Sequence, residues 1–169
     1  MMAAMATNAL PGPPIEGAEL RRAVQGDAAE LLVLQRCCWV AEAIANDTLD
    51  IPALHETLDD VRQWLAEWTT WCVRRRGRLV GGVRAHRDGD AWEIGRLMVA
   101  PDLSGQGLGR WLLGRAEAEA PADVKVISLF TGAKSARNIA IYERAGFRRI
   151  DGGAPPGAVG LAKPRPITG

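Results

Sequence analysis

Residues 100–117 read APDLSGQGLGRWLLGRAE, with glycine at positions 105, 107 and 109. From Leu108 on, Trp111 and Leu112 recur at the spacing of one helical face, and Pro121 closes the pattern. The N-terminus of a helix presents unpaired amide hydrogens and a partial positive charge, and glycine lets an anion approach them closely. The stretch therefore predicts a phosphate-binding loop joined to a helix.

The spacing of the glycines decides between the known kinds of phosphate loop. A P-loop would place Lys and a magnesium-binding Ser or Thr after its last glycine, but Gly109 is followed by Arg110 and Trp111. The dinucleotide pattern G-x-G-x-x-G would need a glycine at Arg110 or at Leu112, depending on where it starts. Both nucleotide loops are excluded, and an anion cradle of backbone amides remains.

Before this loop, the sequence predicts one strand, two helices and three further strands. The first strand covers 18–24, a helix starts after the turn at Gly26 and Asp27, and a second amphipathic helix covers 54–68. Extended runs follow at 71–75, 78–86 and 91–99, and the short turns between them imply antiparallel neighbours. Pro101 ends the third run because it has no amide hydrogen to give to a sheet.

After the loop and its helix, two more units complete the fold. VKVISLF at 124–130 alternates as a strand, Ser135 is placed to cap a helix, and Gly146 ends that helix in a left-handed turn. FRRI and AVGLAK are the last candidate strands. We therefore predict an α/β fold with a mixed, mostly antiparallel central sheet of six to seven strands, flanked by about four helices.

The length of 169 residues suits a single domain. Residues 1–16 lack the charged and continuously apolar regions of a secretion signal and contain Pro and Gly, so we expect a disordered leader there. The domain is expected over 17–163, with a tail over 164–169. No apolar run approaches the roughly 20 residues needed to cross a bilayer, so no membrane span is expected.

Charge and cysteine content narrow the function classes. The formal net charge of +1 gives no overall field for nucleic acid, although RRRGR at 74–78 is a local basic cluster that could contact a phosphate or RNA. Cys37, Cys38 and Cys72 fit neither a disulfide framework nor the spacing of a zinc site, so we expect small buried side chains, no metal and a reducing cytoplasm.

The loop and a later segment together resemble the GNAT superfamily of N-acetyltransferases. Val99-Ala100-Pro101 followed by SGQGLG is similar to the end of a family strand and its Q/R-x-x-G-x-G/A loop, with Ser104 where the family has Arg or Gln. TGAKSARNIAIYERAGF at 131–147 looks like the family segment that carries Asn and Tyr on a helix and ends in Gly-Phe. The resemblance extends over about 18–163, with its motifs confined to 94–117 and 131–147.

The resemblance implies acetyl-CoA as acyl donor and direct attack of a primary amine on its thioester. It implies pyrophosphate binding by the loop, contact of Asn138 with the pantetheine or phosphate arm, and Tyr142 as acid for the departing thiolate. Backbone amides of the preceding strand would polarise the acetyl carbonyl. The implied cofactor-binding residues are Leu97, Met98, Val99, Ser104, Gly105, Gln106, Gly107, Leu108, Gly109, Arg110 and Asn138.

The general base is not fixed by any motif. Glu93 lies on the strand that leads to the loop, on the face expected to carry Gly95, Leu97 and Val99, and is our candidate against a surface glutamate. His86 and His55 have suitable pKa values but no argument from position.

The acceptor stays open between a small molecule, a peptide N-terminus and a lysine. The resemblance places the first two helices beside the acceptor, so Trp39, Trp64 or Trp68 would contact an apolar amine or else pack in the core. A homodimer also stays open. The rival from another class is a CoA-binding sensor or interaction module without turnover.

Overall fold

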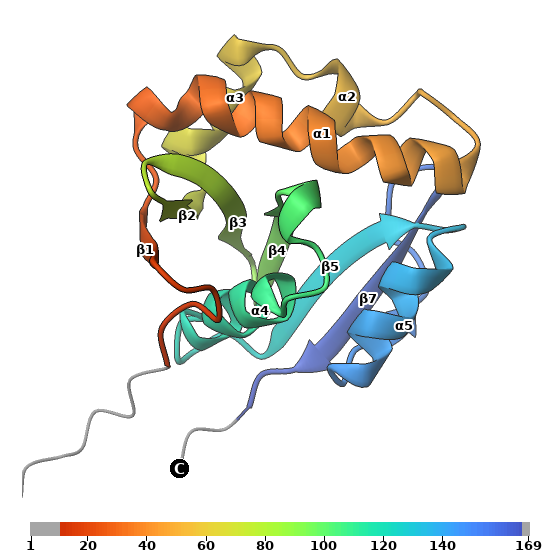
Figure 1. Ribbon diagram of the computed structural model, residues 1–169. Coiled ribbons are helices and arrows are strands. Elements are labelled where there is room, and N and C mark those ends of the chain that lie inside the picture. The colour runs from red at the N-terminus through yellow and green to blue at the C-terminus, as the bar shows by residue number, and fades with distance from the viewer. Residues whose placement is uncertain (1–10, 167–169) are drawn as a thin grey trace, which may run out of the picture.

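The computed structural model describes residues 11–166, which form a seven-stranded sheet and five α-helices (Figure 1). The sheet order is β1-β2-β3-β4-β5-β7-β6, and every neighbouring pair is antiparallel except the parallel pair β4 and β5. The predicted mixed, mostly antiparallel α/β sheet is therefore confirmed. The strands are β1 (Ala18–Arg22), β2 (Thr69–Arg75), β3 (Arg78–Asp88), β4 (Ala91–Val99), β5 (Val126–Gly132), β6 (Arg148–Ile150) and β7 (Ala158–Pro164).

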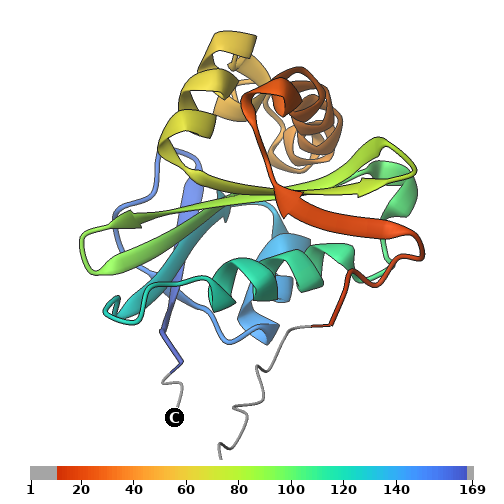
Figure 2. The same ribbon diagram turned by 90° about the vertical axis from the view of Figure 1, so that its left-hand side faces the viewer.

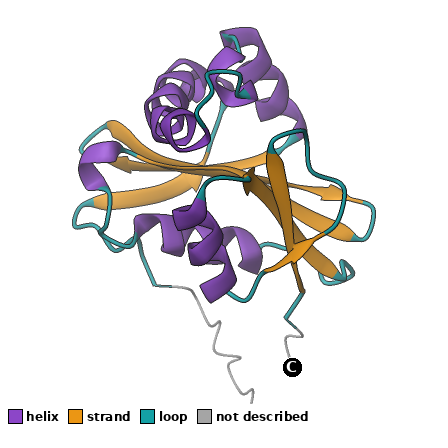
Figure 3. Ribbon diagram, turned by 90° about the vertical axis from the view of Figure 1, so that its right-hand side faces the viewer, coloured by secondary structure: helices purple, strands orange, loops and turns teal. Residues whose placement is uncertain are grey.

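Helices cover both faces of the sheet (Figures 2 and 3). The first three helices lie on one face, and α4 and α5 lie on the other. Gly81 on β3 lets α4 approach closely, because a Cβ there would come within 3.1 Å of the Leu108 side chain. The α-helices are α1 (Ala28–Asn46), α2 (Pro52–His55), α3 (Leu58–Glu67), α4 (Leu108–Ala118) and α5 (Ala136–Arg144), and short 3-10 turns precede α1 and α4 at Gln25–Asp27 and Pro101–Leu103.

The two parallel strands in the middle of the sheet separate along their length. β4 and β5 are paired from Ala91 and Val126 up to Glu93 and Ser128, and no pair follows. The edge of β4 that faces β5 is therefore unpaired from Ile94 to Val99, directly before the glycine loop. We call this unpaired stretch of β4, together with the space between it and β5, the β4/β5 gap.

A β-bulge in β4 changes the face on which its later side chains lie. Gly82 and Arg84 of β3 are two residues apart, whereas their partners Met98 and Gly95 are three apart, and Arg96 between them has φ 48°. An extra residue reverses the alternation of side chains beyond it. Met98 consequently faces α1, where its side chain lies near Gly82, and Val99 faces α4.

The expected second helix is split in two. Glu56 is extended, with φ −57° and ψ 136°, and Thr57 then caps α3 through a hydrogen bond from the Asp60 amide. The capping box stabilises a new helix start, so an apolar pattern that runs through Leu54 to Trp68 does not form one helix.

The chain ends differ in part from the expected leader and tail. Residues 1–10 and 167–169 lie outside the described residues, but Ile15 is 5% exposed and belongs to the core. The Pro11 carbonyl accepts a hydrogen bond from Trp111 Nε1 at 2.8 Å. The segment at 11–16 is thus packed rather than loose, because a buried apolar side chain and a hydrogen bond to α4 anchor it. At the other end, Pro164 closes β7, and the Arg165 amide donates to the Lys125 carbonyl at 2.9 Å.

Candidate active site

The glycine loop presents a row of free amide groups at the start of α4. None of the N–H groups of residues 105–110 donates a hydrogen bond to another described residue. Gly105 and Gly107 have φ 81° and 86°, a conformation that side chains disfavour, so glycine is required to turn these amides outward. Residues 104–107 and Arg110 are exposed. Exposed donors at a helix N-terminus suit an anion such as a phosphate, which is the kind of group that the glycine spacing predicts for this loop.

The N-terminal segment supports this loop from one side. Pro14 Cγ lies 3.9 Å from the position of a Cβ on Gly107, and Trp111 in the first turn of α4 is bonded to Pro11. On the other side, the Val99 side chain lies 3.5 Å from a Cβ position on Gly109. These contacts fix the loop between two segments and leave its amides free. Sequence patterns gave no sign of the Pro11–Ile15 contribution, because an extended Pro-rich segment has no periodicity.

Glu93 lies at the closed end of the β4/β5 gap, on the side of α1 and α3. Its Oε2 is 3.2 Å from His86 Nε2, and the His86 ring is stacked on Trp68 at 3.6 Å between centroids. The expectation that Glu93 shares a face with Val99 is wrong, because the bulge at Arg96 moves Val99 to the opposite face. Gly95 is on the Glu93 face as expected, with Trp68 beside it.

Tyr142 and Asn138 lie on α5 and face the end of α1. Asn138 Nδ2 donates to Glu42 Oε1 at 2.6 Å, and Tyr142 lies edge-on to Phe147. Burial, with a smaller effect from the Glu42 charge, raises the pKa of Tyr142 to about 12. The phenol is therefore a neutral donor near pH 7. Asn138 and Tyr142 come together with Glu42, which has no motif of its own and was missed by sequence reasoning.

Ser135 does not cap α5 with its hydroxyl. The hydroxyl donates to Glu42 Oε2 and accepts from Asn46 Nδ2 at 2.9 Å, and no side-chain cap bond forms. The expected cap is wrong because two polar side chains on α1 compete for the same oxygen. The result is a polar bridge between the end of α1 and the start of α5.

A second group of side chains lies between the sheet and α1–α3; sequence reasoning singled out its tryptophans but missed its two arginines and its glutamate. Arg84 on β3 is 9% exposed, with its guanidinium carbon 4.2 Å from the Trp68 ring centroid and 4.7 Å from that of Trp64. Arg96 Nη2 donates to Glu56 Oε1 at 2.6 Å and lies over the Trp39 ring. The tryptophans thus combine core packing with contacts to buried cations. The residues of this group come from separate strands, helices and loops, so no sequence spacing could reveal that they lie together.

The basic cluster at 74–78 is largely neutralised by its surroundings. Arg74 pairs with Asp27 and Glu30, and Arg78 pairs with Asp102. Arg75 donates to the Glu16 carbonyl. Paired side chains are poorly placed to form a phosphate-binding field, which weakens the RNA reading.

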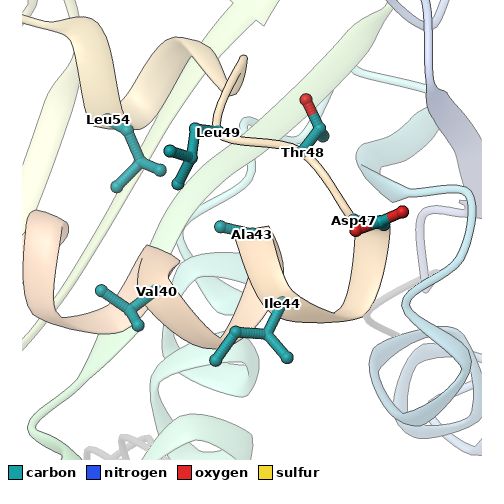
Figure 4. Close-up of a pocket in the computed structure, with 7 residues that line it drawn as sticks. All are labelled: Val40, Ala43, Ile44, Asp47, Thr48, Leu49 and Leu54. Atoms are coloured by element: carbon teal, nitrogen blue, oxygen red, sulfur yellow. The ribbon is translucent and has the colours of Figure 1, made fainter.

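The cysteines and the remaining surface show no further reactive centre. Burial raises the pKa of Cys38 to about 11, and Cys37 is exposed rather than buried as expected. Across residues 11–166, no group of three His, Cys, Asp or Glu could hold a metal ion, and no described helix is long and apolar enough to cross a membrane. A mostly apolar groove of about 470 Å³ lies between α1 and the segment that leads through α2, and it carries none of the candidate catalytic residues. Figure 4 draws the residues that line it: Val40, Ala43, Ile44, Asp47, Thr48, Leu49 and Leu54.

Comparison with known proteins defines the class. The Acetyltransferase (GNAT) family matches residues 31–147, more than half of the chain, and the chain belongs to this family. The members of this family are described as acetyltransferases.

Individual proteins are also similar to this chain. The chain is 27% identical over 124 residues to UPF0157 protein YqkA of Bacillus subtilis and 34% identical over 108 residues to IAA acetyltransferase of Azospirillum brasilense. The matches cover 73% and 62% of this chain, but only 35% and 65% of those two proteins. The structure of PaiA N-acetyltransferase from Thermoplasma acidophilum, in complex with coenzyme A, has a TM-score of 0.67 at 15% identity, covering 87% of this chain and 98% of that one. This last likeness shows a shared fold.

Proposed function

We propose that the protein transfers the acetyl group of acetyl-CoA to a primary amine, by direct attack within a ternary complex. The observation that carries the proposal is the row of free, outward-facing amides at 105–110, which opens onto the unpaired edge of β4. Acetyl-CoA supplies an activated thioester, and this chain supplies the anion cradle, a proton donor and a proton acceptor. Residues 104–110 are assigned to the pyrophosphate, and Asn138 to the pantetheine arm.

The edge of β4 is assigned to the reacting end. Beyond the last β4/β5 pair, backbone amides of Leu97, Met98 and Val99 have no partner on β5. Amides fixed in a strand need no reorganisation to polarise a carbonyl, and such preorganised donors are commonly worth about 3 kcal/mol of barrier each. The bulge at Arg96 helps, because it turns the local backbone away from regular pairing.

Two side chains are assigned to proton transfer. As the new N–C bond forms and the C–S bond breaks, the amine loses a proton and the departing thiolate gains one. Tyr142 suits the donor role because its raised pKa keeps the phenol protonated. Glu93 suits the acceptor role, directly or through water, and its contact with His86 gives the proton a second site.

A coupled binding and turnover experiment tests the proposal. CoA affinity is measured by calorimetry, and release of the CoA thiol from acetyl-CoA is followed with a panel of primary amines. We expect thiol release with at least one amine, and Glu93→Gln should lower kcat while leaving CoA affinity unchanged. CoA binding without thiol release from any amine would favour the sensor alternative, and wild-type kcat in Glu93→Gln would remove Glu93 as base.

A further inference from the structure

The Arg84 guanidinium is a buried cation without a hydrogen-bonded anion. Its Nε and Nη1 are buried and have no hydrogen-bond partner among the described residues. Trp64 and Trp68 lie beside it, but an aromatic face attracts a cation without replacing the in-plane acceptors that a guanidinium prefers. Unsatisfied buried donors cost free energy, so their retention calls for an explanation.

The carboxylates near Arg84 are already engaged by other groups. Glu56 accepts hydrogen bonds from Arg96, Gln35 and Trp64, and Glu93 faces His86. Burial lowers the pKa of Arg84 to about 10, and the next largest effect is repulsion from Arg96, ahead of the attraction of Glu56. A further carboxylate would be stabilised here, because it would satisfy the free donors and offset the repulsion between two cations.

These cations lie beside the assigned reaction centre. Arg84 pairs with Gly95 across the sheet, and its Nε lies 3.6 Å from the position of a Cβ on Gly95. Arg96 is the bulge residue next along β4, and its own Nε is also buried without a partner in the part of the chain described. An anion held by the two guanidiniums would therefore sit within a few atoms of the β4/β5 gap.

The walls of this region are aromatic. Trp64 is 5% exposed, whereas Trp68 is only half-buried, and its ring reaches over Gly95. Of the two rings beside Arg84, Trp68 is thus the more exposed. Trp39 adds a third ring beside Arg96. Aromatic walls around a cation favour an apolar or aromatic body attached to an anionic group.

We propose that the acceptor is an amine that also carries a carboxylate, of the α-amino-acid type with an apolar or aromatic side chain, and that Arg84 and Arg96 bind its carboxylate. This inference rests on the proposed acetyl transfer and names its substrate class. Holding the carboxylate beside Gly95 would place the amine, two bonds away, toward the gap. Polyamines and lysine side chains would be disfavoured, since they bring no carboxylate to the free donors of Arg84 and place a second positive charge beside it.

Matched acceptors and one variant test the assignment. L-phenylalanine, L-leucine and L-methionine are each compared with their carboxamide and with the corresponding decarboxylated amine, and 1,5-diaminopentane is the dicationic probe. The variant is Arg84→Met, which keeps an unbranched apolar side chain between the tryptophans. Arg87→Met, on the same strand but exposed and paired with Asp123, is the control. Thermal unfolding and CoA affinity establish that each variant is folded.

We expect the amino acids to exceed their decarboxylated amines in kcat/KM. In Arg84→Met this ratio should fall by roughly 100-fold, the loss typical of a hydrogen bond to a charged group. The ratio cancels differences in intrinsic amine reactivity, and it should be unchanged in Arg87→Met. Binding of the amino acid to the CoA-loaded wild type should change tryptophan fluorescence, and Arg84→Met should lose that response.

Three kinds of result would overturn the inference, and they can be told apart. Equal kcat/KM values for the amino acids and their decarboxylated amines, comparable acetylation of diaminopentane, or a ratio unchanged in Arg84→Met would overturn the substrate class and leave acetyl transfer standing. CoA binding without thiol release from any amine would overturn the proposed function and the substrate class together. Loss of CoA binding in Arg84→Met would contradict the assignment of Arg84 to the acceptor carboxylate, since that site lies apart from the loop.

Discussion

The two ends of the candidate active site are both suited to anions, but they are built by different physics. The loop at 105–110 uses exposed backbone amides and the N-terminus of α4, and it needs no charged side chain. The cluster of Arg84 and Arg96 uses buried guanidiniums enclosed by tryptophans. A backbone site accepts any phosphate that fits the loop, whereas a buried side-chain site depends on charge and shape. The first end suits a common cofactor, and the second suits a selective acceptor.

The largest effect is expected at the backbone site. Gly107→Glu should weaken CoA binding by more than about 100-fold, because it puts an anion beside the pyrophosphate and a side chain at φ 86°. Calorimetry with CoA measures the change. Gly107→Asn should retain most of the CoA affinity, because asparagine tolerates a positive φ and adds no charge. Gly114→Glu adds the same charge later in α4 in open space and should bind normally; if it behaves like Gly107→Glu, the loop is not the pyrophosphate site.

The next largest effect should separate chemistry from binding. Tyr142→Phe should lower kcat by roughly 100-fold and leave CoA affinity nearly unchanged, because it removes only the proton donor. Because the pKa of Tyr142 is raised to about 12, the phenol stays protonated up to about pH 10. Ionisation of Tyr142 should therefore not reduce the wild-type kcat at any pH up to that value. A steady-state pH series on both proteins measures this. Equal kcat values would exclude Tyr142 as the acid.

A smaller effect is expected from breaking the ion pair at the acceptor end. Burial raises the pKa of Glu56, but hydrogen bonds and charge from Arg96 outweigh it, and the net pKa lies below its ordinary 4.5. Glu56 therefore stabilises the fold above about pH 4.5, and this contribution is lost as the pH falls through the lowered pKa. Glu56→Gln should lower the free energy of unfolding by about 2 kcal/mol at pH 7. This is less than the loss expected when a fully buried ion pair is broken, because both side chains are partly exposed.

Chemical denaturation across pH 3 to 8 measures that difference. The gap between wild type and Glu56→Gln should shrink as the pH falls below about 4.5. A gap that does not change with pH would mean that the Glu56 charge does not stabilise the cluster, and the two ends of the site would then differ less than proposed.

The smallest effect concerns the support of the loop by the N-terminal segment. Trp111→Phe removes the hydrogen bond to the Pro11 carbonyl, which is worth about 1 kcal/mol, and should raise the Kd for CoA a few-fold. Trp92→Phe also removes an indole hydrogen bond to a backbone carbonyl, but at Ala116 near the other end of α4, and should leave CoA affinity unchanged. A CoA affinity equal to that of wild type in Trp111→Phe would show that the segment does not position the loop.

The sequence predicted much of the fold because its signals are local. Apolar spacing in α4, alternation in β5, and the glycine after α5 each report a backbone conformation that neighbouring residues set. The prediction of one continuous second helix was wrong because two local signals compete there: the cap at Thr57 interrupts a continuous apolar pattern. The predicted face of Val99 was wrong because the prediction assumed regular strand alternation without a bulge. The bulge at Arg96 depends on pairing with the neighbouring strand.

The sequence by itself determined the glycine loop proposed as the cofactor end of the site, since a backbone anion cradle requires glycine at set positions before a helix, and that requirement is visible as spacing. Only the tertiary structure decided the acceptor end. Arg84 and Arg96 come together with Trp39, Glu56 and Trp64 from separate parts of the chain. What matters there is that Arg84 is buried and that its Nε and Nη1 have no hydrogen-bond partner within residues 11–166. Burial and pairing are properties of the packed chain, so residue order alone carries no record of them.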